Sequence, residues 1–484
     1  MFKKIIFSVR REEWWIFGFM IAVVSLLNVN FNILRSVRNA LVVADKGGSA
    51  AFIPYFELLG TFPASILLTW VLSRLMRKFS FRFIFFSTML FFLSFFLIFA
   101  FWIYPFRDAI QGLLQNHLGS ISTLPSLQVI FTHWPDMIFY IMSELWKVAL
   151  LSVLFWGFIN QKLSMDEAKR FYPPLMLGSS IGTIAAGPIT VFCTSLLSWD
   201  LFPLASKRWQ HSLCLLTSCM VICGFLTLFC FNSLFKLLQI KNIPLPQVTS
   251  EEKMPFSQRL LSLSSSLRYL MRSPYLTALL VVVVAEYVSY ALGELVFLET
   301  LKEMYPNPSD YCQYLGSLTL WTGILTAFSA LILTPYLLQR CRWSSNALIT
   351  PALMVLMTFS FFFIVYCRKL GLLTDVFVLP VAVFIGSLHF CTGRSMKYTL
   401  FDATKELAFV PLDREGQMRG KLIIDGIGSR LGRGSSSLLS LTLFFFLGGP
   451  SESALFVGIL AILFSFISIP AARLIGAEFD RPVS

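Results

Sequence analysis

Charge is scarce in this sequence, and the residue patterns of a hydrolytic or metal site are missing. Only 13% of the 484 residues are charged, about half of the roughly 25% found in soluble globular proteins. No G-x-x-x-x-G-K-[ST] phosphate loop occurs, and the four histidines lie far apart without metal-ligand spacing. The sequence therefore shows no motif of a nucleotide-hydrolysing site. We expect no catalytic residues, no metal and no cofactor, and a membrane enzyme is the least favoured class.

Apolar residues fill most of the chain instead. Hydrophobic residues make up 56% of it, 50 residues are phenylalanine, and the mean hydropathy is +0.73. This composition predicts an all-α membrane protein, and because about 20 apolar residues cross a bilayer, we predict twelve transmembrane helices. They begin near Trp14, Phe52, Phe83, Met137, Phe171, His211, Tyr275, Tyr314, Asn346, Val376, Lys421 and Glu452.

The net charge of +13 is distributed unevenly along the chain. Lysine and arginine gather in residues 3–11, 74–82, 162–170, 241–272 and 397–421, which the predicted spans place on one side. The positive-inside rule then puts both termini in the cytoplasm, and the basic N-terminus leading into an apolar span without a cleavage site predicts an anchor. These charges indicate orientation and a face suited to anionic membrane lipid. They are not clustered with aromatics on a soluble module, so we expect no nucleic-acid partner.

Residues 241–274 form the long polar segment inside the chain. They separate an N-terminal six-helix half, residues 1–240, from a C-terminal six-helix half, residues 275–484, with the segment itself as a cytoplasmic linker. The halves echo each other, because DEAKRFYP (166–173) follows the fourth predicted span and ATKELAFVP (403–411) follows the tenth. We therefore predict a major-facilitator-like six-plus-six arrangement with a substrate site midway across the membrane.

Ionisable residues inside apolar spans are functional candidates by default, because each is costly to bury. The predicted spans contain or adjoin Glu57, Glu144, Lys147, Glu286, Glu294, Arg394, Asp425, Arg430 and Arg433. Glu144 and Lys147 lie one turn apart and could neutralise each other. Arg430 and Arg433 share a helix face and suit a phosphate group, which arginine binds bidentately.

Several long motifs resemble the ATP/ADP translocase family of plastids and obligate intracellular bacteria. They are SELWKVALLSVLFWGFINQ, DEAKRFYP, KEMYPNPSDY, LFDATKELAFVPLD and RGKLIIDGIGSRLG, and the similarity runs from about residue 28 to about residue 437. The resemblance implies a carrier that exchanges nucleotides across a membrane, commonly ATP for ADP plus phosphate. Some members of the family instead import nucleotides with protons or carry other nucleotides.

The resemblance also implies particular site residues. Glu144 matches the glutamate of the family's fourth span, and Glu294 matches that of its seventh. Arg419, Lys421 and Arg433 fall where the family has basic residues, with Arg433 in place of a lysine in an RLGKSGGS pattern. That replacement keeps the charge and changes its shape.

Departures from the family pattern concern phosphate-binding charges. YFELL places Glu57 where the family has the lysine of FLKLW, and VRNALVV has Asn39 in place of an acid beside the retained Arg38. Phe297 and Leu298 follow Glu294 where the family tends to have W-K. A reversed charge about 4 Å from a phosphate costs about 4 kcal/mol at an effective dielectric constant near 20.

Two rearrangements would accommodate this reversal. In the first, Lys147 replaces the lost phosphate contact while Glu57 pairs with Lys147 or Arg38. In the second, Glu57 titrates and carries a proton with the substrate. The predicted substrate-binding residues are Arg38, Glu57, Glu144, Lys147, Glu294, Arg430 and Arg433.

Three functions follow from this reading. The first is exchange of nucleotides of the ATP/ADP type by alternating access. The second is proton-coupled import of nucleotides, and the third is a membrane protein that kept the fold without transport. An exchanger needs counter-substrate inside, a proton-coupled importer responds to a proton gradient, and nucleotide binding would count against the third reading.

Overall fold

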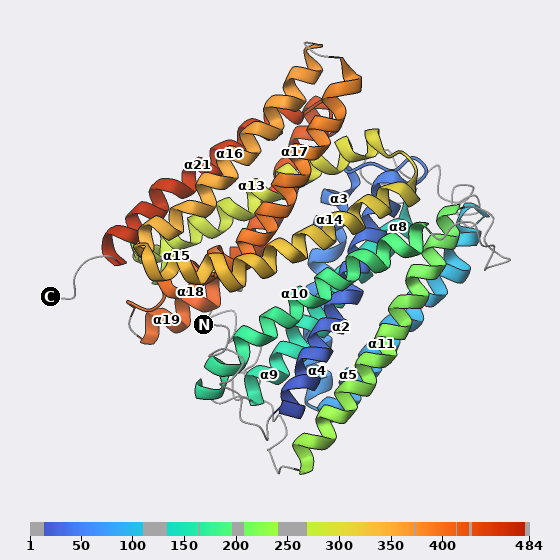
Figure 1. Cartoon of the computed structure of the whole chain (residues 1–484), viewed down its shortest axis with the longest axis vertical. Coiled ribbons are helices and arrows are strands. Elements are labelled where there is room, and N and C mark those ends of the chain that lie inside the picture. The colour runs from blue at the N-terminus through green and yellow to red at the C-terminus, as the bar shows by residue number, and fades with distance from the viewer. Residues whose placement is uncertain are drawn as a thin grey trace. The chain divides into compact units, whose positions relative to one another are not determined.

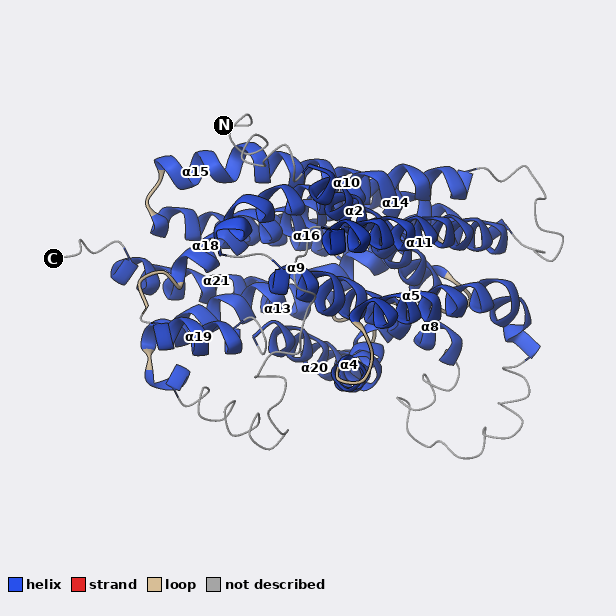
Figure 2. Ribbon diagram, turned by 90° about the horizontal axis from the view of Figure 1, so that it is seen from below, coloured by secondary structure: helices blue, strands red, loops and turns tan. Residues whose placement is uncertain are grey.

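The computed structural model describes residues 14–109, 133–162, 165–195, 208–240, 269–371, 374–412, 414–424 and 428–479. Across these ranges the regular structure is helical, with no β-strand (Figures 1 and 2). Most of the 241–274 linker lies outside the described residues. The chain divides into two compact units, which are described separately below.

Unit 1 comprises residues 1–252 and 305–324. Several of its helices change from α-helical to π-helical winding along their length; the π segments carry η labels. Its elements are α2 (Trp14–Asn39), η2 (Ala40–Ala44), α3 (Phe52–Tyr55), η3 (Phe56–Thr61), α4 (Phe62–Met76), α5 (Phe81–Ile98), η4 (Phe99–Ile103), α8 (Trp134–Trp146), η5 (Lys147–Phe155), α9 (Trp156–Lys162), α10 (Met165–Ser195), α11 (Arg208–Ile240) and most of α14 (Pro308–Phe328).

Unit 2 comprises residues 253–304 and 325–484. Its elements are α13 (Pro274–Met304), η7 (Ser329–Leu333), α15 (Thr334–Arg340), α16 (Trp343–Lys369), α17 (Asp375–Met396), η8 (Lys397–Phe401), α18 (Asp402–Ala408), α19 (Arg414–Ile423), α20 (Ser429–Leu447) and α21 (Ala454–Phe479). Gly371, with φ of 66°, follows α16 and adopts the left-handed conformation that commonly ends a helix.

Eleven helical segments in the described ranges are long and apolar enough to cross a membrane. They begin within a few residues of eleven of the twelve predicted spans. The remaining predicted span, expected to run from Lys421, is instead described as two helices, α19 and α20. Neither is among the eleven. α20 is too polar to count among them because Arg430, Arg433 and four serines lie in its first half, before the apolar residues.

Close polar packing holds α2 in unit 1 against α10 (Figure 1). The Ser25 hydroxyl donates to the Gly178 carbonyl at 2.8 Å, and the Asn28 and Asn32 amides lie 3.2 Å from the hydroxyls of Ser179 and Thr183. At Gly182 an added Cβ would lie 2.2 Å from the Ser25 carbonyl oxygen. Small and hydrogen-bonding residues are the usual means of helix association in membranes, and here they fix α2, which carries Arg38.

The same kind of packing brings α14 into unit 1, although α14 follows α13 in the chain. A Cβ at Gly187 of α10 would lie 2.8 Å from the Gly316 carbonyl of α14, and one at Gly323 would lie 2.8 Å from Ile184. Contacts therefore place most of α14 with the N-terminal helices. The division of the sequence into residues 1–240 and 275–484 stays a prediction.

In unit 2, α13 packs against α21, α20 and α17. The Ser289 and Ser465 hydroxyls lie 2.6 Å apart across the α13–α21 contact. Near the start of α13 the Tyr275 hydroxyl donates to the Ala408 carbonyl at 2.7 Å. These contacts fix α13, which carries Glu286 and Glu294, against the helices that carry Lys397 and Arg433.

Candidate functional site

Four charged residues of the spans lie in or close to segments where helical winding changes. Glu57 is inside η3, Lys147 is the first residue of η5, and Lys397 is the first residue of η8. Arg38 is two residues before η2. π-Helical turns are rare and frequently mark functional sites. For Arg38, Glu57 and Lys147 this coincidence points to residues that the sequence also selects, and it adds Lys397.

Unit 1 brings together three of the predicted site residues, Arg38, Glu57 and Glu144. Together with Tyr140 they form what we call the Arg38 cluster. Arg38 forms a buried ion pair with Glu144, and its guanidinium lies 4.7 Å from the centre of the Tyr140 ring. The Tyr140 hydroxyl donates to Glu57 at 3.1 Å. Arg38 and Glu144 are 6% exposed, so each depends on the other for compensation of its charge.

Lys147 lies in the same unit, on the π segment that directly continues α8. Its ammonium group is 5.2 Å from the centre of the Phe31 ring of α2, a cation–π distance. Arg38 therefore compensates Glu144, and the ammonium of Lys147 is directed at an aromatic ring. Both predicted roles of Lys147, as a structural partner and as a phosphate contact, remain predictions.

Unit 2 contains a small cavity that we call the Lys397 cavity. It is lined by Glu286, Tyr287, Tyr290, Met354, Gly393, Lys397 and Phe401. The Lys397 ammonium lies 3.8 Å from the centre of the Tyr287 ring and 4.9 Å from that of Tyr398. Among the described residues, Lys397 makes no ion pair with a carboxylate. Its described partners are thus the Tyr287 and Tyr398 rings.

A second cation approaches the same ring. The Arg433 guanidinium lies 6.0 Å from the centre of Tyr287, so α13 presents one tyrosine to cations from both η8 and α20. Two like charges near one ring repel each other, and an anion between them would be attracted to both. The geometry thus suits a phosphate group, which lysine and arginine commonly bind.

The other predicted residues of unit 2 are placed differently. Glu294 is half-buried on α13, and Arg430 is exposed at the start of α20 while Arg433 is half-buried. Asp425 and the side chain of Arg419 lie outside the described residues. Next to Glu294, Gly293 lets the buried His389 ring approach, and His389 hydrogen-bonds the Thr358 hydroxyl at 3.1 Å, which is the environment of a structural histidine.

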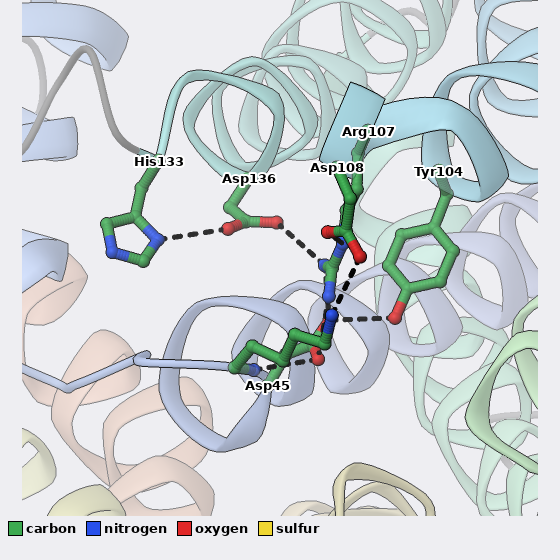
Figure 3. A network of polar contacts seen from close by, with 7 residues as sticks. Asp45, Tyr104, Arg107, Asp108, His133 and Asp136 are labelled. Carbon is green, nitrogen blue, oxygen red and sulfur yellow. Dashed lines mark hydrogen bonds and ion pairs between the residues drawn. The ribbon is translucent and has the colours of Figure 1, made fainter. Parts of the chain in front are cut away.

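A further polar network joins the ends of several unit 1 segments (Figure 3). Arg107 binds both oxygens of Asp45, at 2.5 and 3.1 Å, and the Tyr104 hydroxyl donates to Asp45 at 2.8 Å. Asp136 lies 3.9 Å from Arg107 and 3.4 Å from the His133 ring nitrogen (Figure 3). Arg107, Asp45 and Asp136 are nearly buried, so the network ties the loop after η2 to the start of α8 and the end of the third span.

Sequence reasoning missed Tyr140, Tyr287, Lys397 and this network. Lys397 was counted with the cytoplasmic basic residues because it directly precedes a polar stretch, whereas the structure half-buries it in a helical segment. The tyrosines carry no charge and so gave no signal in a search for ionisable residues. For Lys397 a usable signal existed, since it follows 22 residues of an apolar span.

Comparison with solved structures defines the class of protein. The chain resembles a bacterial homologue of the iron transporter ferroportin in an inward-facing state, with a TM-score of 0.62 over 96% of this chain and 98% of that one at 13% identity. It also resembles a D-xylose–proton symporter, with a TM-score of 0.54 over 96% and 97% of the two chains at 14% identity. With its membrane-spanning helices, the chain is a multi-pass membrane protein of the major-facilitator-like fold.

Sequence comparison gives the family. The chain is 30% identical to ADP,ATP carrier protein 1 of Chlamydia muridarum over 92% of this chain and 84% of that one. It is 28% identical to ADP,ATP carrier protein 3 of Rickettsia prowazekii over 96% and 94%, and 30% identical to the chloroplastic ADP,ATP carrier protein 2 of Arabidopsis thaliana over 94% and 73%. Residues 1–479 match the family described as TLC ATP/ADP transporter. The chain belongs to the TLC ATP/ADP transporter family, which confirms the resemblance found in its motifs.

Proposed function

We propose that this protein exchanges nucleotides of the ATP/ADP type across the inner membrane of a bacterium, with both termini in the cytoplasm. The observation that carries the proposal is the approach of Lys397 and Arg433 to one tyrosine ring inside a membrane-embedded unit. Nucleotides are anions with phosphate groups, and a phosphate group that approaches Lys397 and Arg433 is attracted to both cations. The relatives named as ADP,ATP carriers support the same substrate class.

The residues act by binding, and no step needs hydrolysis. Lys397 and Arg433 hold phosphate oxygens, while Arg38 and Glu144 compensate each other's charge. Alternating access then moves the nucleotide across the membrane, as in other carriers of this fold. Inorganic phosphate would bind to the same cations as the phosphate groups of a nucleotide. This makes inorganic phosphate a candidate co-substrate.

A second candidate function is proton-coupled import of nucleotides. It is favoured by Glu57, a half-buried carboxylate that lies in a π segment and accepts a hydrogen bond from Tyr140 at 3.1 Å. A carboxylate in such a position can gain and lose a proton as its surroundings change. The basic residues near the cytoplasmic ends of the spans also suit contact with anionic lipid.

Uptake of radiolabelled ATP into intact cells that express the full chain tests the proposal. Exchange predicts uptake that external unlabelled ADP rapidly reverses and that a protonophore leaves intact. Uptake that the protonophore abolishes and ADP does not chase would instead show proton coupling. No uptake of any nucleotide, together with no nucleotide-dependent shift in thermal unfolding of the purified protein, would overturn both proposals and favour a protein that kept the fold without transport.

A further inference from the structure

Glu286 has no assigned part in binding, yet it lies in the Lys397 cavity. It is on α13 directly before Tyr287, it is 7% exposed, and it lines the cavity together with Lys397. Its Oε1 is buried and has no hydrogen-bond partner among the described residues. A buried carboxylate oxygen without a hydrogen bond is unfavourable, so a role for Glu286 beside the Lys397 ammonium would explain its position.

The structure shows Lys397 next to Glu286 but directed elsewhere. The ammonium is 3.8 Å from the centre of the Tyr287 ring, and Glu286 and Lys397 share the cavity without forming an ion pair. Lysine has a flexible four-carbon stem and a compact charge. The same ammonium can therefore face the tyrosine and Arg433, where a phosphate would bind, or turn to Glu286.

Building on the proposed function, we propose that Glu286 is an internal counter-charge that competes with the nucleotide's phosphates for Lys397. When a nucleotide is bound, Lys397 contacts phosphate and Glu286 lies unpaired nearby. When the nucleotide leaves, Lys397 pairs with Glu286, and the cavity holds no isolated charge. Glu286 is thus a positioning residue that raises the free energy of the loaded state and favours release.

This role predicts a particular kinetic change on neutralisation. In Glu286→Gln the phosphate no longer meets a nearby negative charge, and Lys397 loses its alternative partner. Nucleotide should bind more tightly and leave more slowly, so that KM and kcat of exchange both fall, each by about tenfold. Their ratio kcat/KM should change little, which is the pattern expected when destabilisation of the bound ground state is removed.

The experiment compares Glu286→Gln with Glu299→Gln in full-length protein reconstituted into liposomes loaded with ADP. Glu299 is on the same helix, lies 3.7 Å from Lys302 and is not part of the cavity lining. Initial rates of ATP uptake give KM and kcat, and nucleotide-dependent thermal unfolding gives binding. We expect both parameters to fall in Glu286→Gln and to match the wild type in Glu299→Gln.

A double-mutant comparison separates counter-charge from packing. With Lys397→Met in the background, Glu286→Gln should strengthen nucleotide binding much less, because only the direct repulsion between Glu286 and phosphate is then removed. Glu286→Asp, which keeps the charge, should stay closer to the wild type than Glu286→Gln. An unchanged or raised KM in folded Glu286→Gln, or the same strengthening with and without Lys397, would overturn this role. It would leave the proposed exchange intact as long as the wild type transports; absence of nucleotide binding by the wild type would instead overturn the proposed function.

Discussion

The buried charges of the two units have different kinds of described partners. In unit 1 the Arg38 guanidinium is paired with Glu144, and Glu57 receives a hydrogen bond from Tyr140. In unit 2 the described contacts of the Lys397 ammonium are aromatic rings, and Arg433 approaches one of those rings. The described partner of Arg38 is thus a carboxylate, whereas the described partners of Lys397 are aromatic rings.

This difference indicates where a nucleotide's negative charge is accommodated. A carboxylate near the phosphates raises the free energy of binding, and a cation lowers it. The resemblance to the family implies a lysine at the position of Glu57, and under the proposed function its absence would shift the requirement for phosphate binding towards unit 2. Four substitutions would break or sharpen this comparison.

The largest effect should come from Glu144→Gln, which leaves the Arg38 guanidinium buried without its counter-charge. Breaking one partner of a buried ion pair costs about 3–5 kcal/mol, so the protein should unfold at a clearly lower temperature in detergent and lose exchange. Asp108→Asn is the matched control. It removes ion pairs with Lys46 and Arg107, but the Asp108 side chain is itself 61% exposed, and pairs of an exposed carboxylate contribute about 0–1 kcal/mol.

The double variant Arg38→Gln/Glu144→Gln tests whether the loss of stability in Glu144→Gln comes from the unpaired Arg38 charge. Removal of both charges should restore much of the lost thermal stability, since no isolated charge remains. Transport should stay impaired if the pair also serves the substrate. If Glu144→Gln alone leaves stability unchanged, the pair does not compensate a buried charge, and the contrast between the units fails.

Lys397→Met should reduce kcat/KM for ATP exchange by roughly 100-fold, because a charge-assisted contact to phosphate contributes about 1.5–3 kcal/mol. Thermal stability in the absence of nucleotide should hold or rise, since a half-buried cation is removed. Lys302→Met is the control, because Lys302 is on α13 and its described partner is Glu299. Equal losses in both variants would show that Lys397 has no special role. Lys397→Arg should fall between wild type and Lys397→Met.

Much of the fold was predictable because it depends on composition and hydropathy. Eleven predicted spans correspond to long helices, since the need to cover a bilayer core dictates some 20 apolar residues in each. The eleventh predicted span is the least apolar of the twelve, and the structure describes it as α19 and α20, on either side of residues 425–427. Its arginines and serines keep α20 below the hydropathy of the other spans, and polar residues of this kind are tolerated where helices pack.

The site was predictable only where a residue is charged and inside an apolar run. Arg38, Glu57 and Glu144 were selected from the sequence, and the structure gathers them in one cluster. Which partner each would find depends on the packing of α2, η3 and α8, and sequence spacing carries no such information. The nearest base to Glu144 in the sequence is Lys147, yet the ion pair that the structure shows involves Arg38, which is 106 residues away.

Gly182→Ala tests whether the Arg38 cluster depends on the close contact of α2 with α10. The added Cβ would lie 2.2 Å from a backbone oxygen, and overpacking of this kind costs about 1–3 kcal/mol. The protein should melt earlier and exchange more slowly, with a smaller effect than Glu144→Gln. Gly157→Ala is the matched control, because a Cβ there meets nothing within 4 Å and alanine favours the helix by up to about 1 kcal/mol. Similar melting of the two variants would contradict a tight α2–α10 contact.

Glu57→Gln should have the smallest effect on stability and transport. The direction in which KM for ATP changes tests the contrast between the two units. The amide oxygen still accepts the Tyr140 hydrogen bond, so thermal stability should change by less than about 1 kcal/mol. Removing one negative charge from unit 1 should lower KM for ATP a few-fold. In an exchanger, uptake by this variant stays insensitive to a protonophore, as in the wild type. If wild-type uptake collapses with the protonophore and Glu57→Gln uptake does not, Glu57 carries the proton, and the reversed charge in unit 1 would then be part of the coupling mechanism.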